Sequence, residues 1–170
     1  LYMALTGARD MSVIDTPPEE RLPIRTQVAE MSDSLVRKAI LREKGRGGQV
    51  YFVHNRVQGI RQIAQHLNKI VPEARLVIGH GQMDEHELSR VMIDFMEGKY
   101  DVLLCTTIIE SGLDIPSVNT IIINQADKFG LAQLYQLRGR VGRSSVQAYA
   151  YLLHNKGQTL SGIAKSRLET

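Results

Sequence analysis

Three short segments of the chain are apolar on successive residues, and this feature restricts the fold most strongly. They cover residues 102–105, 120–123 and 148–152. A strand with one face in water alternates apolar and polar residues, whereas a strand covered on both faces is apolar throughout. We therefore expect these segments to be strands inside a sheet that has helices packed on both faces.

Helical patterns alternate with the apolar segments along the chain. Apolar residues recur at three-and-four spacing in residues 33–43, 57–70 and 84–95, and short strands are expected at 49–53 and 75–78. Asn55 and Asp84 are candidate N-caps, and Pro72 stops the second helix. Strands that alternate with helices form βαβ units. The predicted fold class is therefore α/β, with a parallel sheet between two layers of helices.

Length, charge and cysteine content narrow the class of protein. A chain of 170 residues suits a single domain, and 21 Lys and Arg against 18 Asp and Glu give a mildly basic net charge of +3. Cys105 is the single cysteine and lies in an apolar segment, so we expect a buried thiol and no internal disulfide. The sequence shows neither a membrane-length apolar run nor a secretory leader, so we expect a cytoplasmic protein without a membrane partner.

The sequence lacks the motifs with which one domain holds and hydrolyses a nucleotide. A phosphate-binding loop needs Gly, four residues and Gly-Lys-Ser/Thr, but the one Gly-Lys pair, Gly98-Lys99, is followed by Tyr100. No apolar strand ends in paired carboxylates for Mg²⁺, and no histidines stand at metal-ligand spacing, so we expect no metal site. We expect the chain alone not to hydrolyse ATP.

Residues 136–143 have the sequence QLRGRVGR, in which we expect Arg140 and Arg143 on one face of a helix. Planar guanidinium groups suit phosphate oxygens, and an arginine supplied to a transferring phosphate contributes about 10³ to 10⁵ in rate. The alternative is a basic helix end that serves solubility or a surface ion pair. Gly139 and Gly142 favour the phosphate role, because a glycine within a helix costs about 0.8–1 kcal/mol relative to alanine and indicates close backbone packing.

A second polar segment, TTIIESGLDIP at residues 106–116, follows an apolar segment directly. The hydroxyls of Thr106 and Thr107 suit a phosphate, and they equally suit a helix N-cap. Gly112 followed by Asp114 indicates a tight turn whose carboxylate is directed at a hydroxyl or a water. A hydrogen-bonded turn aspartate is the alternative for Asp114.

Polar residues also follow two other predicted strands. Residues 54–56 are His, Asn and Arg, and residues 79–82 include His80. Because ligands of open parallel sheets bind at the carboxyl ends of the strands, we expect both loops to be able to contact a nucleic-acid backbone. A turn histidine with a satisfied ring is the alternative for His80.

Three segments together resemble, in order and spacing, the motifs of the second RecA-like lobe of superfamily 2 helicases and translocases. They are residues 49–55, 106–116 and 136–143. Within that superfamily, FGLAQL at 129–134 and IGHGQM at 78–83 are similar to the branch of bacterial transcription-repair coupling factors and RecG fork-remodelling helicases, and most similar to the coupling factors. Gln136 stands where many RNA helicases have histidine, which agrees with a DNA branch.

The resemblance implies a motor in which ATP and Mg²⁺ bind between two lobes and are held mainly by the first lobe, which this sequence lacks. Arg140 and Arg143 would then reach the γ-phosphate, and Gln136 would couple the nucleotide to DNA. Gly112 and Asp114 would lie along the nucleotide cleft. The DNA-backbone contacts implied in the same way are Arg56, His80, Thr106 and Thr107.

The implied activity is ATP-dependent translocation on double-stranded DNA, directed at stalled RNA polymerase in transcription-coupled excision repair. The implied partners are duplex DNA, the first lobe and, through other domains, RNA polymerase and excision-repair proteins. The chain begins at Leu1 without methionine and ends within a helical pattern, so we expect part of a longer protein. We expect residues 1–20 to connect the lobes, 21–153 to form the second RecA-like lobe, and 154–170 to begin a translocation helical hairpin.

Two other functions remain open at this point. The first is a RecG-like fork-remodelling lobe, which domains flanking the chain in its parent gene would reveal. The second is a non-catalytic RecA-like module that binds nucleic acid or a protein, with its motifs retained for folding.

Overall fold

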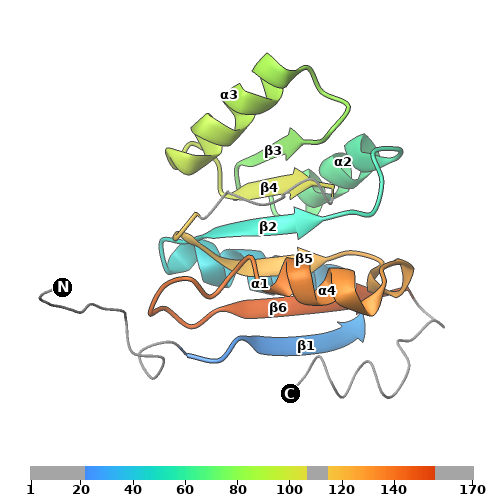
Figure 1. Ribbon diagram of the computed structural model, residues 1–170, viewed down its shortest axis with the longest axis vertical. Helices are drawn as coiled ribbons and strands as arrows, with labels where there is room; N and C mark the ends of the chain where they lie inside the picture. The colour runs from blue at the N-terminus through green and yellow to red at the C-terminus, as the bar shows by residue number, and fades with distance from the viewer. Residues whose placement is uncertain (1–21, 107–114, 156–170) are drawn as a thin grey trace, which may run out of the picture.

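A computed structural model of the chain describes residues 22–106 and 115–155. In this part a parallel sheet has the strand order β1-β6-β5-β2-β4-β3 (Figure 1). The strands are β1 (Arg25–Glu30), β2 (Gln49–Val53), β3 (Leu76–Gly79), β4 (Val102–Cys105), β5 (Val118–Ile123) and β6 (Tyr149–His154). The helices are α1 (Asp33–Gly45), α2 (Ile60–Ile70), α3 (Glu85–Met96), α4 (Leu131–Arg138) and the short 3₁₀ helix η3 (Ala126–Lys128).

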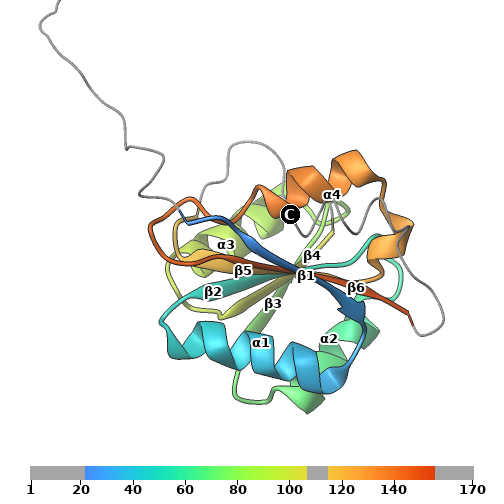
Figure 2. The same ribbon diagram turned by 90° about the horizontal axis from the view of Figure 1, so that it is seen from below.

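The sheet lies between two layers of helices, which confirms the predicted fold class. Helices α1 and α2 cover one face, and α3 and α4 cover the other (Figure 2). Alternate residues of the central strands enter two separate apolar clusters: Tyr51 and Leu103 pack with Phe95 of α3, whereas Phe52 and Leu104 pack with Ile40 of α1. The continuous apolar runs of β2, β4 and β5 exist because both of their faces are buried.

Two helix starts differ in detail from the sequence prediction. Helix α2 begins after Gly59, which takes a left-handed φ of 84°, so the predicted N-cap at Asn55 is wrong. Residues 54–59 instead form a loop at the end of β2, and this loop belongs to the site described below. Asp84 does occupy the N-cap position of α3, although its side chain makes no capping hydrogen bond.

Strand β1 lies at an edge of the sheet and was not expected from the sequence. Its sequence, RTQVAE, is mostly polar, and Val28 is its one buried residue. It pairs in parallel with β6 alone, with Arg25 opposite Tyr149. Because one side of an edge strand is unpaired and exposed, the apolar pattern that marks the central strands is absent here.

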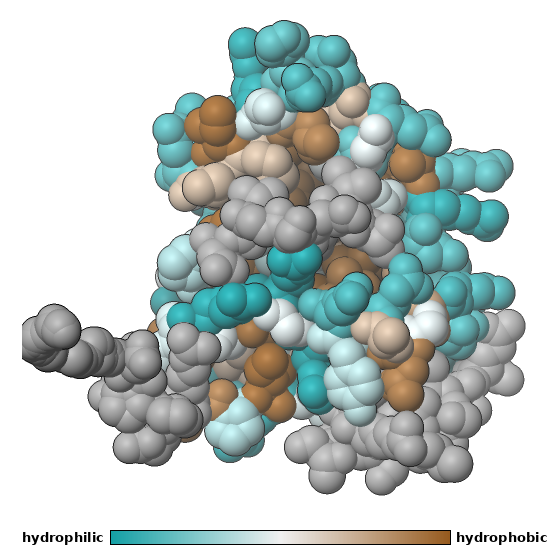
Figure 3. All heavy atoms as spheres, viewed as in Figure 1, coloured by the Kyte–Doolittle hydropathy of each residue, from teal (hydrophilic) through white to brown (hydrophobic). Residues whose placement is uncertain are grey.

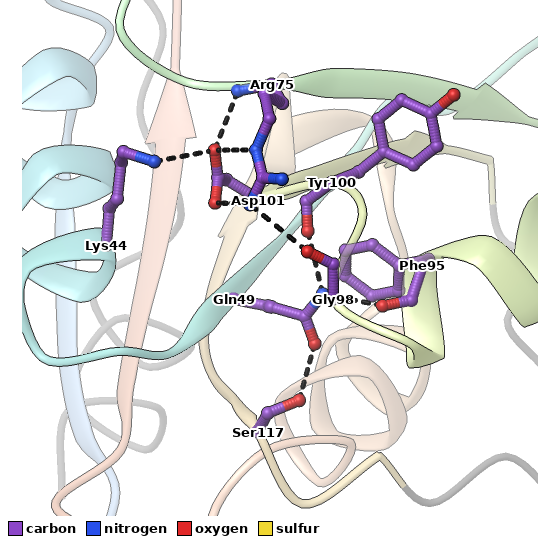
Figure 4. A network of polar contacts seen from close by, with 8 residues as sticks. All are labelled: Lys44, Gln49, Arg75, Phe95, Gly98, Tyr100, Asp101 and Ser117. Carbon is purple, nitrogen blue, oxygen red and sulfur yellow. Dashed lines mark hydrogen bonds and ion pairs between the residues drawn. The ribbon is translucent and has the colours of Figure 1, made fainter.

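The amino ends of β2 and β4 are joined by a network of polar side chains (Figure 4). Asp101 accepts hydrogen bonds from Lys44 Nζ at 3.0 Å and from the backbone N–H of Arg75 at 2.8 Å, and its carboxylate pairs with the Arg75 guanidinium. Burial alone would raise the pKa of Asp101, but the hydrogen bonds from Arg75 and Lys44 outweigh burial and lower that pKa to about 2. The network therefore holds a charged carboxylate at the base of the sheet.

Gln49 completes this network. Its Nε2 donates to the carbonyl oxygens of Phe95 at 2.7 Å and Tyr100 at 2.8 Å, and its Oε1 accepts from Ser117 Oγ at 2.5 Å. Ser117 stands between residue 115 and the start of β5. The start of β2 is thus tied both to the end of α3 and to the chain that enters β5.

Cys105 is buried, as the sequence predicts, and burial raises the pKa of its thiol. Within residues 22–106 and 115–155, none of the helices combines the length and the apolar character that crossing a bilayer requires. The predicted interlobe connection at 1–20 and most of the predicted hairpin at 154–170 lie outside the described residues.

Candidate functional site

The carboxyl ends of the parallel strands bring together loops that are far apart in the sequence. His54 follows β2, His80 follows β3, Thr106 follows β4 and Asn124 follows β5. The expected common edge is therefore present. We call it the carboxyl edge and define it by residues 54–59, 79–83, 106 and 124–125. In Figure 3 hydrophilic side chains project on the side of the molecule where α2 lies, beside this edge.

His54 and Asn124 form the buried centre of the carboxyl edge. The His54 backbone N–H donates to the Cys105 carbonyl oxygen at 2.8 Å, and the Asn124 backbone N–H donates to the Val53 carbonyl oxygen at 2.9 Å. The side chains are joined by a hydrogen bond of 3.2 Å between Asn124 Nδ2 and His54 Nδ1. Burial, and then the charge of Arg56, lower the pKa of His54, so the ring is neutral near pH 7.

A cleft of about 350 Å³ opens beside this pair, between the ends of β2 and β5 and helix α2. Gln125 on its rim has a φ of 53°, the one left-handed non-glycine backbone among the described residues. Such a conformation costs of order 1–3 kcal/mol and persists only where the surroundings hold it. The residues lining the cleft include His54, Arg56, Gln62, His66, Asn124 and Gln125.

The predicted DNA contacts occupy different depths of the carboxyl edge. Arg56 is exposed and has neither an ion pair nor a hydrogen bond within the described part of the chain. Thr106 is buried directly after β4. Thr107 lies outside the described residues, as do Gly112 and Asp114.

His80 lies in a turn, which agrees with the turn-histidine alternative. Its Nδ1 accepts from the Gln82 backbone N–H at 3.1 Å, and its own N–H contacts Met83 Sδ at 3.2 Å. The side chain nevertheless lines a second cleft of about 460 Å³, together with Arg61. A contact between His80 and a ligand is thus compatible with the turn that holds it.

Arg140 and Arg143 do not project from one face of a helix, so that prediction is wrong. Helix α4 ends at Arg138, with Gly139 as its C-cap, and both arginines lie in the following turn. Gly142 in this turn has a left-handed φ of 84°, which ends helical geometry. Arg143 is exposed, and its Nε donates to the Gly139 carbonyl oxygen at 3.2 Å.

The two glycines of this segment play different parts. A Cβ added at Gly142 would lie 3.0 Å from Ile24 Cγ1, so the expected close packing is confirmed there. A Cβ at Gly139 would make ordinary contacts, the nearest being 3.4 Å to the Tyr135 carbonyl oxygen, so close packing does not explain that glycine. Of the two glycines, it is therefore Gly142 that lets the turn pack closely against Ile24, the residue before β1.

The arginine turn lies toward the amino ends of the strands and not at the carboxyl edge. Ser144 Oγ donates to Asn119 Oδ1 at 3.1 Å near the start of β5, and Arg138 Nη1 contacts Thr26 Oγ1 of β1 at 3.5 Å. Gln136 is exposed on α4. The structure thus separates the predicted phosphate-facing arginines from the predicted DNA contacts.

The described residues near the arginine turn offer cations to a nucleotide. Within residues 22–106 and 115–155, no group of three or more His, Cys, Asp and Glu side chains is placed to hold a metal ion. The groups that suit a triphosphate are the guanidinium groups of Arg140 and Arg143.

No residue in the loop after residue 123 was named in the sequence analysis. Asn124 and Gln125 are the residues it missed. Their one sequence signal is a pair of amides directly after an apolar strand. The partner of Asn124, His54, is 70 positions away in the chain, so the pair depends on β2 and β5 being neighbours.

Comparison with known proteins finds relatives over nearly the whole chain. The pattern of the helicase conserved C-terminal domain matches residues 31–145. The chain is 54% identical to the transcription-repair-coupling factor of Bacillus subtilis (strain 168) and 57% identical to that of Escherichia coli (strain K12), over 169 residues and 99% of the chain. It spans only 14% and 15% of the length of those two relatives.

Solved structures show the same fold. A structure of RecG bound to a three-way DNA junction matches with a TM-score of 0.74 and 37% identity, over 91% of this chain and 20% of that chain. Domain 2 of a DEAD-box helicase bound to an RNA duplex matches with a TM-score of 0.63 and 17% identity, over 78% of this chain and 55% of that chain. The second likeness bears on the fold alone.

Proposed function

The chain belongs to the helicase conserved C-terminal domain family, and from this premise we propose that it is the second motor lobe of an ATP-dependent translocase on double-stranded DNA. Its similarity to transcription-repair-coupling factors supports a motor that acts on stalled RNA polymerase in transcription-coupled excision repair. RNA polymerase and excision-repair proteins would bind through other domains of the parent protein. Such a motor works on bacterial DNA, so we expect a cytoplasmic location.

The observation that carries this proposal is the separation of two polar sites on one rigid sheet. The carboxyl edge presents Arg56 and His80, whereas the arginine turn lies toward the amino ends of β5 and β1. Hydrogen bonds tie neighbouring strands together at both ends of this sheet: Ser117 Oγ donates to Gln49 at the amino end, and the His54 backbone N–H donates to the Cys105 carbonyl oxygen at the carboxyl end. A movement of the arginine turn on ATP binding or hydrolysis would then be transmitted through the sheet to the DNA contacts at the carboxyl edge.

On the nucleotide side, Arg140 and Arg143 would contact the γ-phosphate of an ATP held mainly, with Mg²⁺, by the first lobe. Cations on the transferring phosphate stabilise the charge that develops in the transition state. The close packing of Gly142 on Ile24 and the bond from Arg143 to Gly139 limit the positions that the Arg143 side chain can take. Gly112 and Asp114 would line the nucleotide cleft between the two lobes. Gln136 would couple nucleotide binding to DNA binding.

On the DNA side, Arg56, His80, Thr106 and Thr107 would contact phosphates and not base edges. Contacts to phosphates position a protein on a duplex without reading its sequence, which suits a motor that moves along any sequence. Duplex binding should therefore weaken with salt, by about 0.9 in log K per log salt for each phosphate neutralised.

The test is DNA-stimulated ATP hydrolysis by the full-length parent protein carrying Arg140→Ala or Arg143→Ala, with nucleotide affinity measured alongside. We expect hydrolysis to fall by about 10² or more while nucleotide binding is largely kept. Arg90→Ala, on the exposed surface of α3, is the matched control and should hydrolyse normally. Near-normal turnover in both test variants would contradict the proposal and favour a non-catalytic module.

A RecG-like fork-remodelling lobe is the second candidate, supported by the structural match to RecG. The identity to RecG, 37%, is lower than that to the coupling factors, 54–57%. Domains flanking the chain in its parent gene decide between the two. A polymerase-binding domain would support the coupling function, and a wedge domain that binds single strands would support fork remodelling.

A further inference from the structure

His54 joins the three strands at the centre of the sheet. It extends β2, its backbone N–H bonds to the end of β4 through the Cys105 carbonyl oxygen, and its ring bonds to Asn124 after β5. Asn124 is itself held by the carbonyl oxygen of Val53. Both side chains are more than nine-tenths buried, so their hydrogen bond is shielded from water.

This junction stands where the chain changes direction across the sheet. From β2 the chain proceeds to β3 and β4 on one side, and then returns to β5 and β6 on the other side of β2. Ligands of open parallel sheets bind at such points, outside the carboxyl ends of the two diverging strands. The cleft that contains His54, Asn124 and Gln125 lies at this point.

Each hydrogen-bonded neighbour of His54, and His54 itself, is followed in the sequence by a residue of the carboxyl edge. Arg56 lies two positions after His54 in the same loop. Thr106 follows Cys105, whose carbonyl oxygen accepts from the His54 backbone N–H. Gln125, with its left-handed φ, follows Asn124. We propose that His54 and Asn124 are positioning residues for duplex binding, because their hydrogen bond fixes the loops after β2 and β5 relative to each other. This inference rests on the proposed function.

The hydrogen bond requires an unprotonated Nδ1 on His54. Asn124 Nδ2 can only donate, so a proton on His54 Nδ1 would place two donors against each other. The other charged or titratable groups at the cleft are Arg56 on the same loop and His66 on α2, whose Nε2 lies 2.7 Å from Asp33 Oδ1 at the start of α1. The pairing of Asn124 with His54 is thus sensitive to acid.

The variants follow from the geometry of the pair. His54→Leu removes the acceptor, whereas His54→Asn offers a carbonyl oxygen close to the position of Nδ1. Asn124→Leu removes the donor from the opposite strand. His86→Leu is the matched control, because His86 is exposed on α3 and lines neither of the two clefts described above.

The experiment measures duplex-stimulated ATP hydrolysis by the full-length parent protein against DNA concentration. We expect His54→Leu and Asn124→Leu each to raise the half-saturating DNA concentration about tenfold, with the rate at saturation within about twofold of the unmodified protein. His54→Asn should restore the half-saturating concentration to within about threefold, and the control His86→Leu should not change it. Unchanged half-saturation in both Leu variants, or an Asn variant as impaired as His54→Leu, would overturn the proposal.

A pH series covers the case in which a Leu variant does not fold. In the unmodified protein, the half-saturating DNA concentration should rise only at a pH below 6.5, the ordinary pKa of histidine, because burial lowers the pKa of folded His54. In His54→Asn the part of this rise that is due to His54 should be missing, and an identical rise in both proteins would overturn the proposal. A parent protein whose ATP hydrolysis ignores duplex DNA would refute the proposed function itself, whereas stimulated hydrolysis that is indifferent to His54 and Asn124 would refute only this inference.

Discussion

The two edges of the sheet use polar side chains in opposite ways. At the amino edge, Asp101 is saturated by Lys44 and Arg75, and Gln49 uses both ends of its amide on neighbouring groups. At the carboxyl edge a neutral buried pair lies beneath Arg56, which has no partner within the part of the chain that the structure describes. Polar groups that satisfy one another stabilise the fold, whereas an unpaired cation above a rigid base is available to a ligand.

The largest effect on stability is expected at the amino edge. Asp101→Ala removes the acceptor of several hydrogen bonds to a mostly buried carboxylate and should lower the free energy of unfolding by about 2–3 kcal/mol. Urea denaturation of the chain measures it. Arg75→Ala, which removes a more exposed partner, should cost less. A loss below about 0.5 kcal/mol for Asp101→Ala would break the comparison between the edges.

A somewhat smaller effect is expected where the arginine turn packs on the rest of the lobe. Gly142→Ala introduces a side chain at a left-handed φ and 3.0 Å from Ile24 Cγ1, so it should destabilise the chain by about 1–2 kcal/mol. Gly139→Ala is the matched control, since its backbone is right-handed and open to a Cβ. Thermal denaturation measures the loss of stability in each variant. An equal loss in Gly142→Ala and Gly139→Ala would show that close packing at Gly142 does not hold the turn.

The two edges should also lose stability in different pH ranges. The pKa of His54 is lowered on folding, so the unfolded chain binds more protons and stability falls as the pH drops below about 6.5. The pKa of Asp101 is lowered to about 2, so its contribution is complete above about pH 4 and is lost as the pH falls toward 2. Urea midpoints against pH should lack the upper step in His54→Asn and the lower step in Asp101→Asn.

The smallest effect on stability is expected from the exposed cation of the carboxyl edge. Arg56→Ala should change the free energy of unfolding by less than about 0.5 kcal/mol, because the side chain is exposed and has no partner among the described residues. The same change should reduce the slope of log K for duplex binding against log salt by about 0.9. Anisotropy titrations of the parent protein at several salt concentrations measure this slope, and an unchanged slope would remove Arg56 from the DNA contacts.

The central part of the fold was predictable from the sequence because both faces of the central strands are buried. Residues 102–105 form β4 as expected, and residues 120–123 lie within β5. Strand β1 was missed because an edge strand carries too few buried residues to show an apolar pattern. Helix α4 was extended too far because sequence spacing does not reveal that the helix ends at Arg138, with Gly139 as its C-cap.

The candidate site was predictable only in part. Residues that directly follow parallel strands lie at one edge of the sheet. The positions of Arg56, His80 and Thr106 could therefore be predicted from the pattern of strands. The pairing of His54 with Asn124 did not follow, because it depends on which strands are neighbours. The distance between the arginine turn and the carboxyl edge likewise depends on where α4 ends.

The central claim, that the two sites of this lobe serve different ligands, is tested most directly by comparing Arg56→Ala with Arg143→Ala in duplex-stimulated ATP hydrolysis by the parent protein. We predict that Arg56→Ala raises the half-saturating DNA concentration about fivefold and leaves the saturated rate unchanged. Arg143→Ala should lower the saturated rate about 100-fold and leave the half-saturating DNA concentration unchanged. Two variants that alter the same quantity would contradict the division of labour between the edge and the turn.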